Sequence, residues 1–138
     1  MSDFDQQIID EFRANAGRVE TMGFGDSLVL LHSTGAKSGR ERVNPVMAIP
    51  TPDGGWLIAA SKGGAPDNPL WYANLTAHPE ATIEIGAETV EVAAREIVGD
   101  EYPAAWSRFT SRSPAFAKYE ERAGGRHIPV IELSRREG

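Results

Sequence analysis

The sequence predicts a mainly β protein of the α+β class, in which strands build a small barrel and helices are inserted between them. Short runs of four to nine apolar or alternating residues are bounded by Gly, Pro or Asp, which is typical of strands. Helical patterns interrupt these runs without the regular strand–helix alternation of a doubly wound sheet. A chain of 138 residues fits one domain, expected over residues 1–138, and is long enough to bury a core without disulfide bonds.

An N-terminal amphipathic helix is expected over residues 1–17, capped by Ser2 or Asp3. Its apolar side chains recur every four residues and therefore share one face: Phe4, Ile8, Phe12 and Ala16. Gly17 is placed to stop the helix. Because the segment is also rich in acidic residues, docking on an anionic lipid surface is disfavoured and we expect the apolar face to pack on the barrel.

Three strands are expected next, over residues 28–33, 41–49 and 56–60. The connection Thr51–Gly55 contains Pro, Asp and Gly residues, which predicts a hairpin between the second and third strands. Pro45 has no N–H to donate to a strand ladder. It therefore indicates an edge, a bulge or a place where a ligand replaces the neighbouring strand.

A short helix and a second hairpin follow. The helix is expected to be capped by Asp67 or Asn68, to carry Pro69 in its first turn and to end near residue 77. The hairpin is expected to pair residues 82–85 with residues 90–94 across a Gly-containing turn.

The last part of the chain changes from a strand pattern to a helix pattern and back. Helical spacing places five aromatic side chains on one face: Tyr102, Trp106, Phe109, Phe116 and Tyr119. A final strand is expected over residues 128–133. The barrel with its inserted helices would thus span residues 27–133.

The composition excludes several kinds of function. Without cysteine the chain cannot be a disulfide scaffold or use a thiol nucleophile, and its three histidines lie too far apart for the usual spacing of a metal site. A net charge of −6 and the lack of a nucleic-acid-binding motif argue against a nucleic-acid partner. Because neither an export signal nor a run of roughly 20 apolar residues is visible, we expect a soluble, cytoplasmic protein with no integral membrane segment.

The charge is distributed unevenly along the chain. Residues 1–34 and 73–105 carry net charges of −4 and −6, whereas residues 35–72 carry +1 and residues 106–138 carry +3. The acidic protein therefore has a basic middle, where local positive charge can attract a small anion despite the overall sign.

Two Gly-rich turns concentrate the cations of this basic middle. The first, residues 34–42, contains Lys37, Arg40 and Arg42, and the second, after the third strand, contains Lys62. Backbone N–H groups and cationic side chains in such turns can cradle an anionic group. From the residues alone, an anionic cofactor site and a pair of solvated turns both stay open. Because no side-chain constellation supplies the chemistry, an enzyme of this sequence would take its reactivity from a bound organic cofactor.

Residues 31–75 resemble the deazaflavin-dependent nitroreductase family. The matching stretches read LHSTGAKSGRERVNPVM, from Leu31, and AASKGGAPDNPLWYANL, from Ala59. The likeness extends less sharply through the acidic hairpin to the stretch RHIPV near the C-terminus. The resemblance implies the fold of that family, a split β-barrel similar to the FMN-binding split barrels, and its cofactor, the deazaflavin coenzyme F420.

The resemblance also implies a cofactor site. The phosphate and glutamyl tail would be held by Lys37, Ser38, Arg42 and Lys62. The pocket would be lined by Ala36, Val43, Asn44, Pro45, Val46 and Met47. The deazaflavin ring would face Ala59, Ala60 and Ser61, and the pocket would be closed by Leu70, Trp71, Tyr72, Ala73 and Asn74. For Trp71 and Tyr72, packing in the core of the domain is an equally good interpretation.

The chemistry implied is hydride transfer from the reduced deazaflavin to a small electron-poor acceptor. The candidate catalytic residues are Ser61, which would orient the ring or the acceptor, and Tyr119, which would supply a hydroxyl. The substrate side would be formed by Met47, Ser113, Phe116 and Tyr119. The nitroimidazole-activating member of the family has tyrosine at all four positions, and only one is tyrosine here, so nitroimidazoles are disfavoured among the quinone, enone and nitro acceptors.

Two other functions fit the same residues. One is an FMN-dependent oxidoreductase on a related split barrel, and the other is a non-catalytic protein that binds or carries F420. Formation of a homodimer is also left open.

Overall fold

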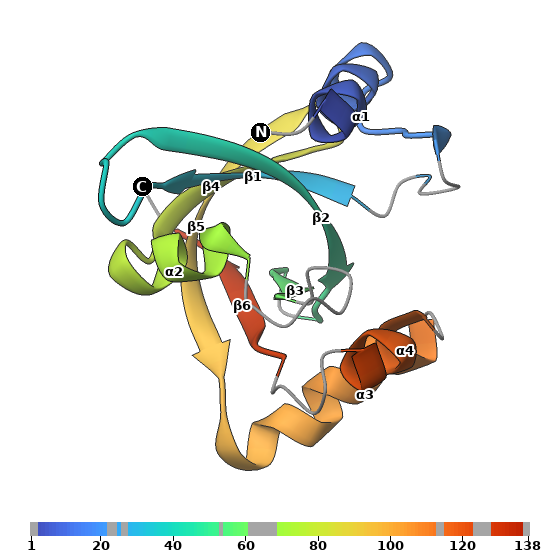
Figure 1. The fold of residues 1–138 in the computed structure, drawn as a ribbon, viewed down its shortest axis with the longest axis vertical. Coiled ribbons are helices and arrows are strands. Elements are labelled where there is room, and N and C mark those ends of the chain that lie inside the picture. Colours follow the sequence, from blue (N-terminus) through green and yellow to red (C-terminus); the bar gives the residue numbers. More distant parts are fainter. Residues whose placement is uncertain are drawn as a thin grey trace.

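The computed structural model describes residues 3–21, 25, 28–52, 54–60, 69–112, 115–122 and 128–136. Within these residues, six antiparallel strands close into a barrel in the order β1-β2-β3-β6-β5-β4 (Figure 1). Their bounds are β1 Leu28–Thr34, β2 Glu41–Pro50, β3 Trp56–Ala59, β4 Glu80–Ile85, β5 Glu88–Ile97 and β6 Val130–Arg135. The expected mainly β barrel with inserted helices is confirmed.

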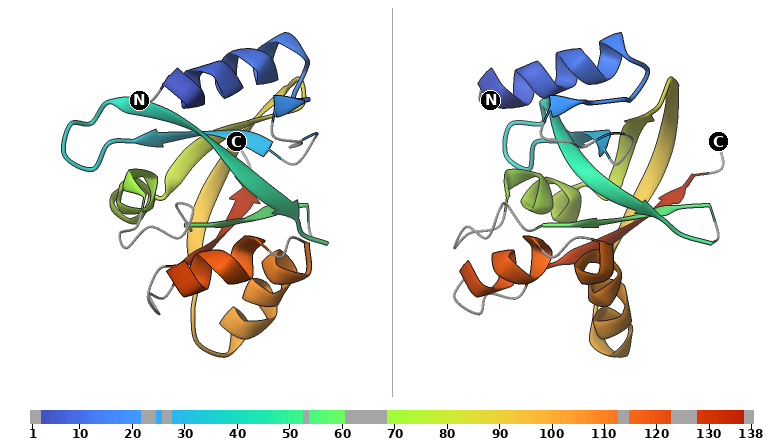
Figure 2. Two further views of the ribbon diagram at one scale, coloured as in Figure 1. Left: turned by 45° about the vertical axis from the view of Figure 1, so that its right-hand side comes forward. Right: turned by 90° about the vertical axis from the view of Figure 1, so that its right-hand side faces the viewer.

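Helices cover the barrel from several sides. They are α1 Asp3–Ala14, α2 Leu70–Ala77, the short 3-10 helix η3 Gly99–Glu101, α3 Tyr102–Arg112 and α4 Ala115–Arg122. Figure 2 shows α1 at one end of the molecule and the pair α3 and α4 at the opposite end. In the described part of the chain, no helix has the length and apolar character needed to cross a membrane.

Strand alternation divides the apolar residues of β1 between two cores. Val29 and Leu31 point into the barrel, where they join Ile58, Ile83 and others in the barrel core. The intervening Leu28 and Leu30 point outward and pack with the apolar face of α1. This arrangement follows from the period of two residues in a strand, and it explains why four successive apolar residues are all buried.

β2 pairs with a different strand in each of its two parts. Residues 41–47 pair with β1, and residues 48–50 pair with β3. Among the described residues, the first seven residues of β2 therefore have a strand partner on one side only. Pro45 lies in this half, opposite Leu30, which agrees with the edge that its missing N–H indicates.

The end of α1 differs in detail from the expectation. The helix ends at Ala14, and the chain leaves it through a turn in which the Gly17 N–H donates to the Phe12 carbonyl at 2.8 Å. Gly17 has φ +96°, so glycine acts as the helix stop as expected. Placing Ala16 on the apolar face was wrong, because it lies beyond the helix and is exposed, and Ile9 is buried beside Ile8 and Phe12.

Three other boundaries shift. α2 begins at Leu70, so Pro69 is its N-cap rather than a first-turn residue, while Asp67 and Asn68 lie outside the described residues. The second hairpin is longer than expected and pairs residues 80–85 with residues 88–93. The last strand begins at Val130, two residues later than expected.

Candidate functional site

The first Gly-rich turn joins β1 to β2 and is closed by its own backbone. The Gly35 N–H donates to the Arg40 carbonyl at 2.7 Å, and the Gly39 N–H donates to the Gly35 carbonyl at 3.0 Å. A Cβ at position 35 would lie 2.5 Å from the Ser38 Oγ, and Gly39 has φ +70°. Both glycines are therefore required by the tight turn itself.

Most of the amides in this turn already have protein acceptors. The Ala36 N–H donates to the Asn74 Oδ1 at 3.0 Å, and the Arg40 N–H donates to the Ser38 Oγ at 3.2 Å. Within the described residues, the amides of Lys37 and Ser38 are left without such an acceptor. An anion at this turn would therefore be bound by these two amides and by side-chain cations, rather than by a ring of backbone donors.

Three cations lie on the turn or directly after it: Lys37 and Arg40 in the turn, and Arg42 as the second residue of β2. Lys37, Arg40 and Arg42 are exposed and form no ion pair with any described residue. By contrast, Arg13 pairs with Glu84 at 2.8 Å and Arg95 pairs with Glu132 at 3.1 Å. The turn and the start of β2 therefore present three cations whose charge is not neutralised by an ion pair with a described residue.

The expected pocket residues of β2 do not share one face. Val46 packs against the barrel core, and Val43 and Met47 pack against the cluster under α1. Side chains alternate along a strand, so these neighbours cannot all line one cavity with their side chains. What residues 43–47 share is the backbone edge that no described strand covers, and this edge is the part of β2 that is open to a ligand.

The residues expected on α2 play several different structural roles. Trp71 is buried in the barrel core, as the packing interpretation predicts. Tyr72 packs against the same core, and its hydroxyl donates to the Glu96 Oε1 at 2.5 Å. This hydrogen bond and burial raise the pKa of Tyr72. Leu70 is 84% exposed at the start of the helix, and Ala73 is exposed as well.

Asn74 is the polar residue of α2 that points inward. It is 7% exposed, and its two side-chain polar atoms bond to the Ala36 N–H and to the Ser33 Oγ. Ser33 is itself buried in β1, at 1% exposure. The sequence does not indicate this role for Ser33, because a serine in a predicted strand carries no signal of what faces it.

The structure brings three expected substrate-side residues together. Phe116 is buried, and Met47, Ala59 and Tyr119 pack against the same apolar cluster. The rings of Phe116 and Tyr119 meet edge to face, 5.5 Å apart. These residues come from β2, β3 and α4, so only folding makes them neighbours. Ser61, Lys62 and Ser113 lie outside the described residues.

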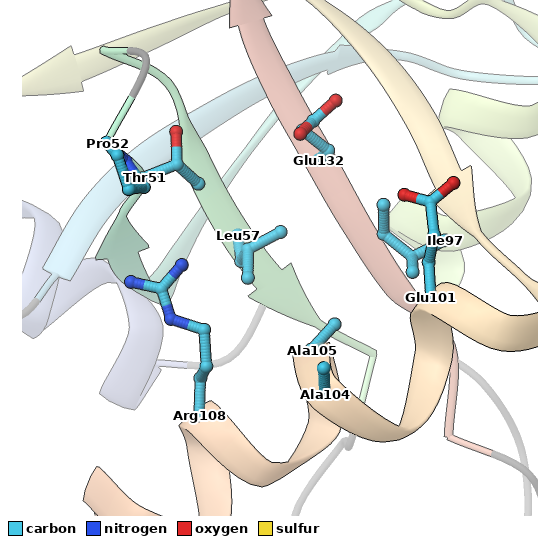
Figure 3. A pocket seen from close by; sticks show the side chains of 9 residues that line it. All are labelled: Thr51, Pro52, Leu57, Ile97, Glu101, Ala104, Ala105, Arg108 and Glu132. Atoms are coloured by element: carbon cyan, nitrogen blue, oxygen red, sulfur yellow. The ribbon is translucent and has the colours of Figure 1, made fainter.

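A groove of about 420 Å³ lies elsewhere, on the outer side of the barrel against α3 (Figure 3). Leu57, Ile97 and Ala105 contribute apolar surface to it, while Glu101, Glu132 and Arg108 contribute charge. Arg108 extends from α3 toward the β2–β3 connection and donates to the Pro50 carbonyl at 2.8 Å. The groove contains none of the residues expected at the site, and no sequence motif points to it.

Solved structures with a similar fold place the protein in the class of split β-barrels. An F420H2-dependent reductase named FDR-A superposes with a TM-score of 0.70 and 35% identity, covering 78% of this chain and 94% of that chain. A structure described as a domain-swapped dimer superposes with a TM-score of 0.72 and 31% identity, covering 94% and 96% of the two chains. The expected split β-barrel is thus confirmed.

Sequence comparison then defines the family within this class. The family model described as F420H(2)-dependent quinone reductase matches residues 6–134. An F420H(2)-dependent quinone reductase of Mycobacterium tuberculosis, strain H37Rv, is 35% identical over 130 residues, which is 91% of this chain and 85% of that protein. The chain belongs to the F420H(2)-dependent quinone reductase family. The expected deazaflavin-dependent family is confirmed, with quinone reductase as its more accurate name.

Proposed function

We propose that this protein is an oxidoreductase that uses the reduced deazaflavin coenzyme F420 to reduce a small quinone. The observation that carries the proposal is the group of three cations on the β1–β2 turn and the start of β2 that form no ion pair with a described residue, in a chain of this family. The F420 tail is polyanionic, and cations with no internal counter-ion are what such a tail requires.

The donors available at the turn fit the tail of this cofactor. Lys37 and Arg42 would bind its phosphate and carboxylate groups, assisted by the amides of Lys37 and Ser38, which have no acceptor among the described residues. The Ser38 oxygen accepts from Arg40, so its hydroxyl hydrogen remains available as a donor. Lys62 would add a cation from the second turn. When bound, the reduced deazaflavin supplies the hydride.

The cluster of Met47, Ala59, Phe116 and Tyr119 would form the acceptor side of the site. Its apolar and aromatic surface suits a flat conjugated ring and excludes water from it. Tyr119 would orient the acceptor through its hydroxyl. Ser61, which lies outside the described residues, would orient the deazaflavin ring or the acceptor. The protein groups thus mainly bind and position the reactants.

Titration of the purified protein with F420, followed by turnover with a soluble naphthoquinone, tests the function. We expect saturable binding in the micromolar range and oxidation of the reduced cofactor that depends on the quinone. Absence of binding at tens of micromolar F420 would refute the proposal. Tight binding without turnover of quinones, enones or nitro compounds would identify a carrier protein, and flavin absorbance of the purified protein would identify an FMN enzyme.

We further propose that the protein forms a homodimer, because a relative at 31% identity is described as a domain-swapped dimer. Light scattering coupled to size-exclusion chromatography measures the mass directly, and a monomer mass of 15.0 kDa would refute this point. The cytoplasmic location and the lack of a nucleic-acid partner stay predictions.

A further inference from the structure

Asn74 connects two parts of the fold that lie far apart in the sequence. From α2, its Oδ1 accepts the Ala36 N–H at 3.0 Å and its Nδ2 donates to the Ser33 Oγ at 3.2 Å. Ala36 lies in the β1–β2 turn directly before Lys37, and Ser33 lies inside the barrel on β1. The amide group is therefore fixed at one end by the barrel and holds the turn at the other.

The bond to Ala36 differs from the other hydrogen bonds of this turn. Those from Gly35, Gly39 and Arg40 all have acceptors within the turn, so they set its shape but not its direction. Among the described residues, the Asn74 bond is the one that ties the turn to a different element. It therefore anchors to α2 the part of the turn that lies directly before Lys37.

We propose that Asn74 is a positioning residue, which acts through Ala36 to hold the β1–β2 turn so that Lys37 faces the anionic tail of the cofactor. The inference rests on the proposed function, and it changes the role that family resemblance suggests for Asn74. A residue that is 7% exposed and has protein partners on both polar atoms contributes to binding through the turn.

The position requires an amide for a chemical reason. The site needs one acceptor for the Ala36 N–H and one donor for the Ser33 hydroxyl, and asparagine supplies both on one short side chain. Asn74→Leu keeps the number and branching of the side-chain heavy atoms but provides neither. Asn74→Asp keeps the acceptor and, when ionised, loses the donor.

Hydrogen exchange of the cofactor-free protein tests the positioning directly. In Asn74→Leu we expect the Ala36 amide to exchange at least about tenfold faster than in the wild type. Asn74→Asp should retain the protection, because its carboxylate still accepts from Ala36. Thr76→Ala on the exposed side of α2 is the matched control and should leave the Ala36 amide unchanged, since the Thr76 hydroxyl donates to the Tyr72 carbonyl within its own helix. Wild-type exchange at Ala36 in Asn74→Leu would overturn the inference.

The consequence for the cofactor is measured separately. We expect the F420 dissociation constant and its KM to rise about tenfold in Asn74→Leu, with kcat at saturating cofactor unchanged. Ser33→Ala should raise the F420 dissociation constant and the KM by a smaller factor, although Ser33 is buried in the barrel away from solvent. If Asn74→Leu does not fold, Ser33→Ala alone decides, and an unchanged dissociation constant in it overturns the inference. Faster exchange with unchanged F420 affinity also overturns it, whereas wild-type protein that fails to bind F420 refutes only the proposed function.

Discussion

Arg42 is paired across the strands with Ser33, on the face of β2 that turns toward α2. It is exposed and has no ion-pair partner among the described residues, so removing it breaks no internal contact of that kind. We expect Arg42→Ala to weaken F420 binding by about 1 to 3 kcal/mol, through the loss of charge-assisted hydrogen bonds, without loss of protein stability.

Fluorescence titration of F420 measures this effect. Arg18→Ala serves as the control, because Arg18 is an exposed arginine after α1 that pairs with Glu20 at 2.6 Å. If wild type, Arg42→Ala and Arg18→Ala bind F420 with equal affinity, the β1–β2 turn is a solvated surface loop and not a cofactor site.

Phe116 sets the polarity of the expected acceptor side. It is 6% exposed and packs edge to face with Phe109 and Tyr119. Phe116→Tyr adds a hydroxyl near Tyr119, so we expect the ratio of kcat/KM values for nitro and quinone acceptors to rise while the F420 dissociation constant is unchanged. The added hydroxyl also lacks an evident partner in this cluster, which should lower stability by about 1 to 3 kcal/mol. A weakened F420 affinity would show that Phe116 is not on the acceptor side.

At the scale of elements, the end of α1 is fitted against the β4–β5 hairpin. A Cβ at Gly17 would lie 2.6 Å from the Gly86 Cα, which is backbone and cannot rotate away. Gly54 has a similar positive φ, +88° against +96°, but open space around it. Comparing the two glycines therefore separates backbone strain from steric overlap.

We expect Gly54→Ala to cost about 1 kcal/mol of unfolding free energy, from the strained φ alone. Gly17→Ala should cost about 1 to 3 kcal/mol more, because the hairpin must also move. Urea denaturation monitored by tryptophan fluorescence measures both values. Equal costs for the two variants would mean that the contact between α1 and the hairpin is loose.

A polar network fastens α1 to the barrel. Arg13 forms a two-pronged contact with Glu84 at 2.8 and 3.2 Å, and the His32 Nε2 lies 2.6 Å from the same carboxylate. The His32 Nδ1 lies 3.3 Å from the Glu41 Oε1. The Arg13 hydrogen bond, followed by that of His32, lowers the pKa of Glu84 despite partial burial.

The lowered pKa of Glu84 predicts how stability depends on pH. The unfolded chain binds more protons on this group than the folded chain near its ordinary value of 4.5, so the contribution is present above that pH and is lost as pH falls through the folded pKa. Glu84→Gln should therefore differ fully from wild type above about pH 5.5, and the difference should shrink toward about pH 3. Urea denaturation across this range, with Glu121→Gln on α4 as control, measures it. Parallel curves for wild type and Glu84→Gln would contradict the assignment.

For the whole molecule, binding and stability are linked. A ligand that binds only the folded protein stabilises it by about 2.7 kcal/mol at about 100 times its dissociation constant. We expect F420 to raise the unfolding free energy of the wild type by this amount, and that of Arg42→Ala by less at the same concentration. Denaturation with and without F420 gives the result independently of any acceptor. No stabilisation of the wild type would contradict folded-state binding.

Much of the fold could be predicted because its strands are local patterns. The runs around Leu30 and Ile83 are bounded by turn residues, and Gly17 marks the end of α1 in the sequence as in the structure. Strand order and the exact ends could not be predicted. Pro69, for example, is the N-cap of α2 instead of a residue of its first turn, because local sequence preference sets a helix end only to within one or two residues.

The candidate site was predictable only as a set of residue types. The cations Lys37 and Arg42 stand out in the sequence because glycines surround them in an otherwise acidic chain. The alternation of β2, by contrast, separates Val46 from Met47, although both belong to one continuous matching stretch. The partner of Asn74 in the turn, 38 residues away, has no signature in the sequence at all.

The mainly β class, the deazaflavin-dependent family and the basic turn could be predicted from the sequence alone, because composition, spacing and turn chemistry are properties of neighbouring residues. Only the folded structure shows that Lys37, Arg40 and Arg42 form no ion pair with a described residue, and that Asn74 holds the turn from α2. It also shows that Met47, Ala59 and Tyr119 pack against the apolar cluster that contains Phe116. These contacts join residues that are distant along the chain, and their energies depend on burial and distance, which exist only once the barrel has closed.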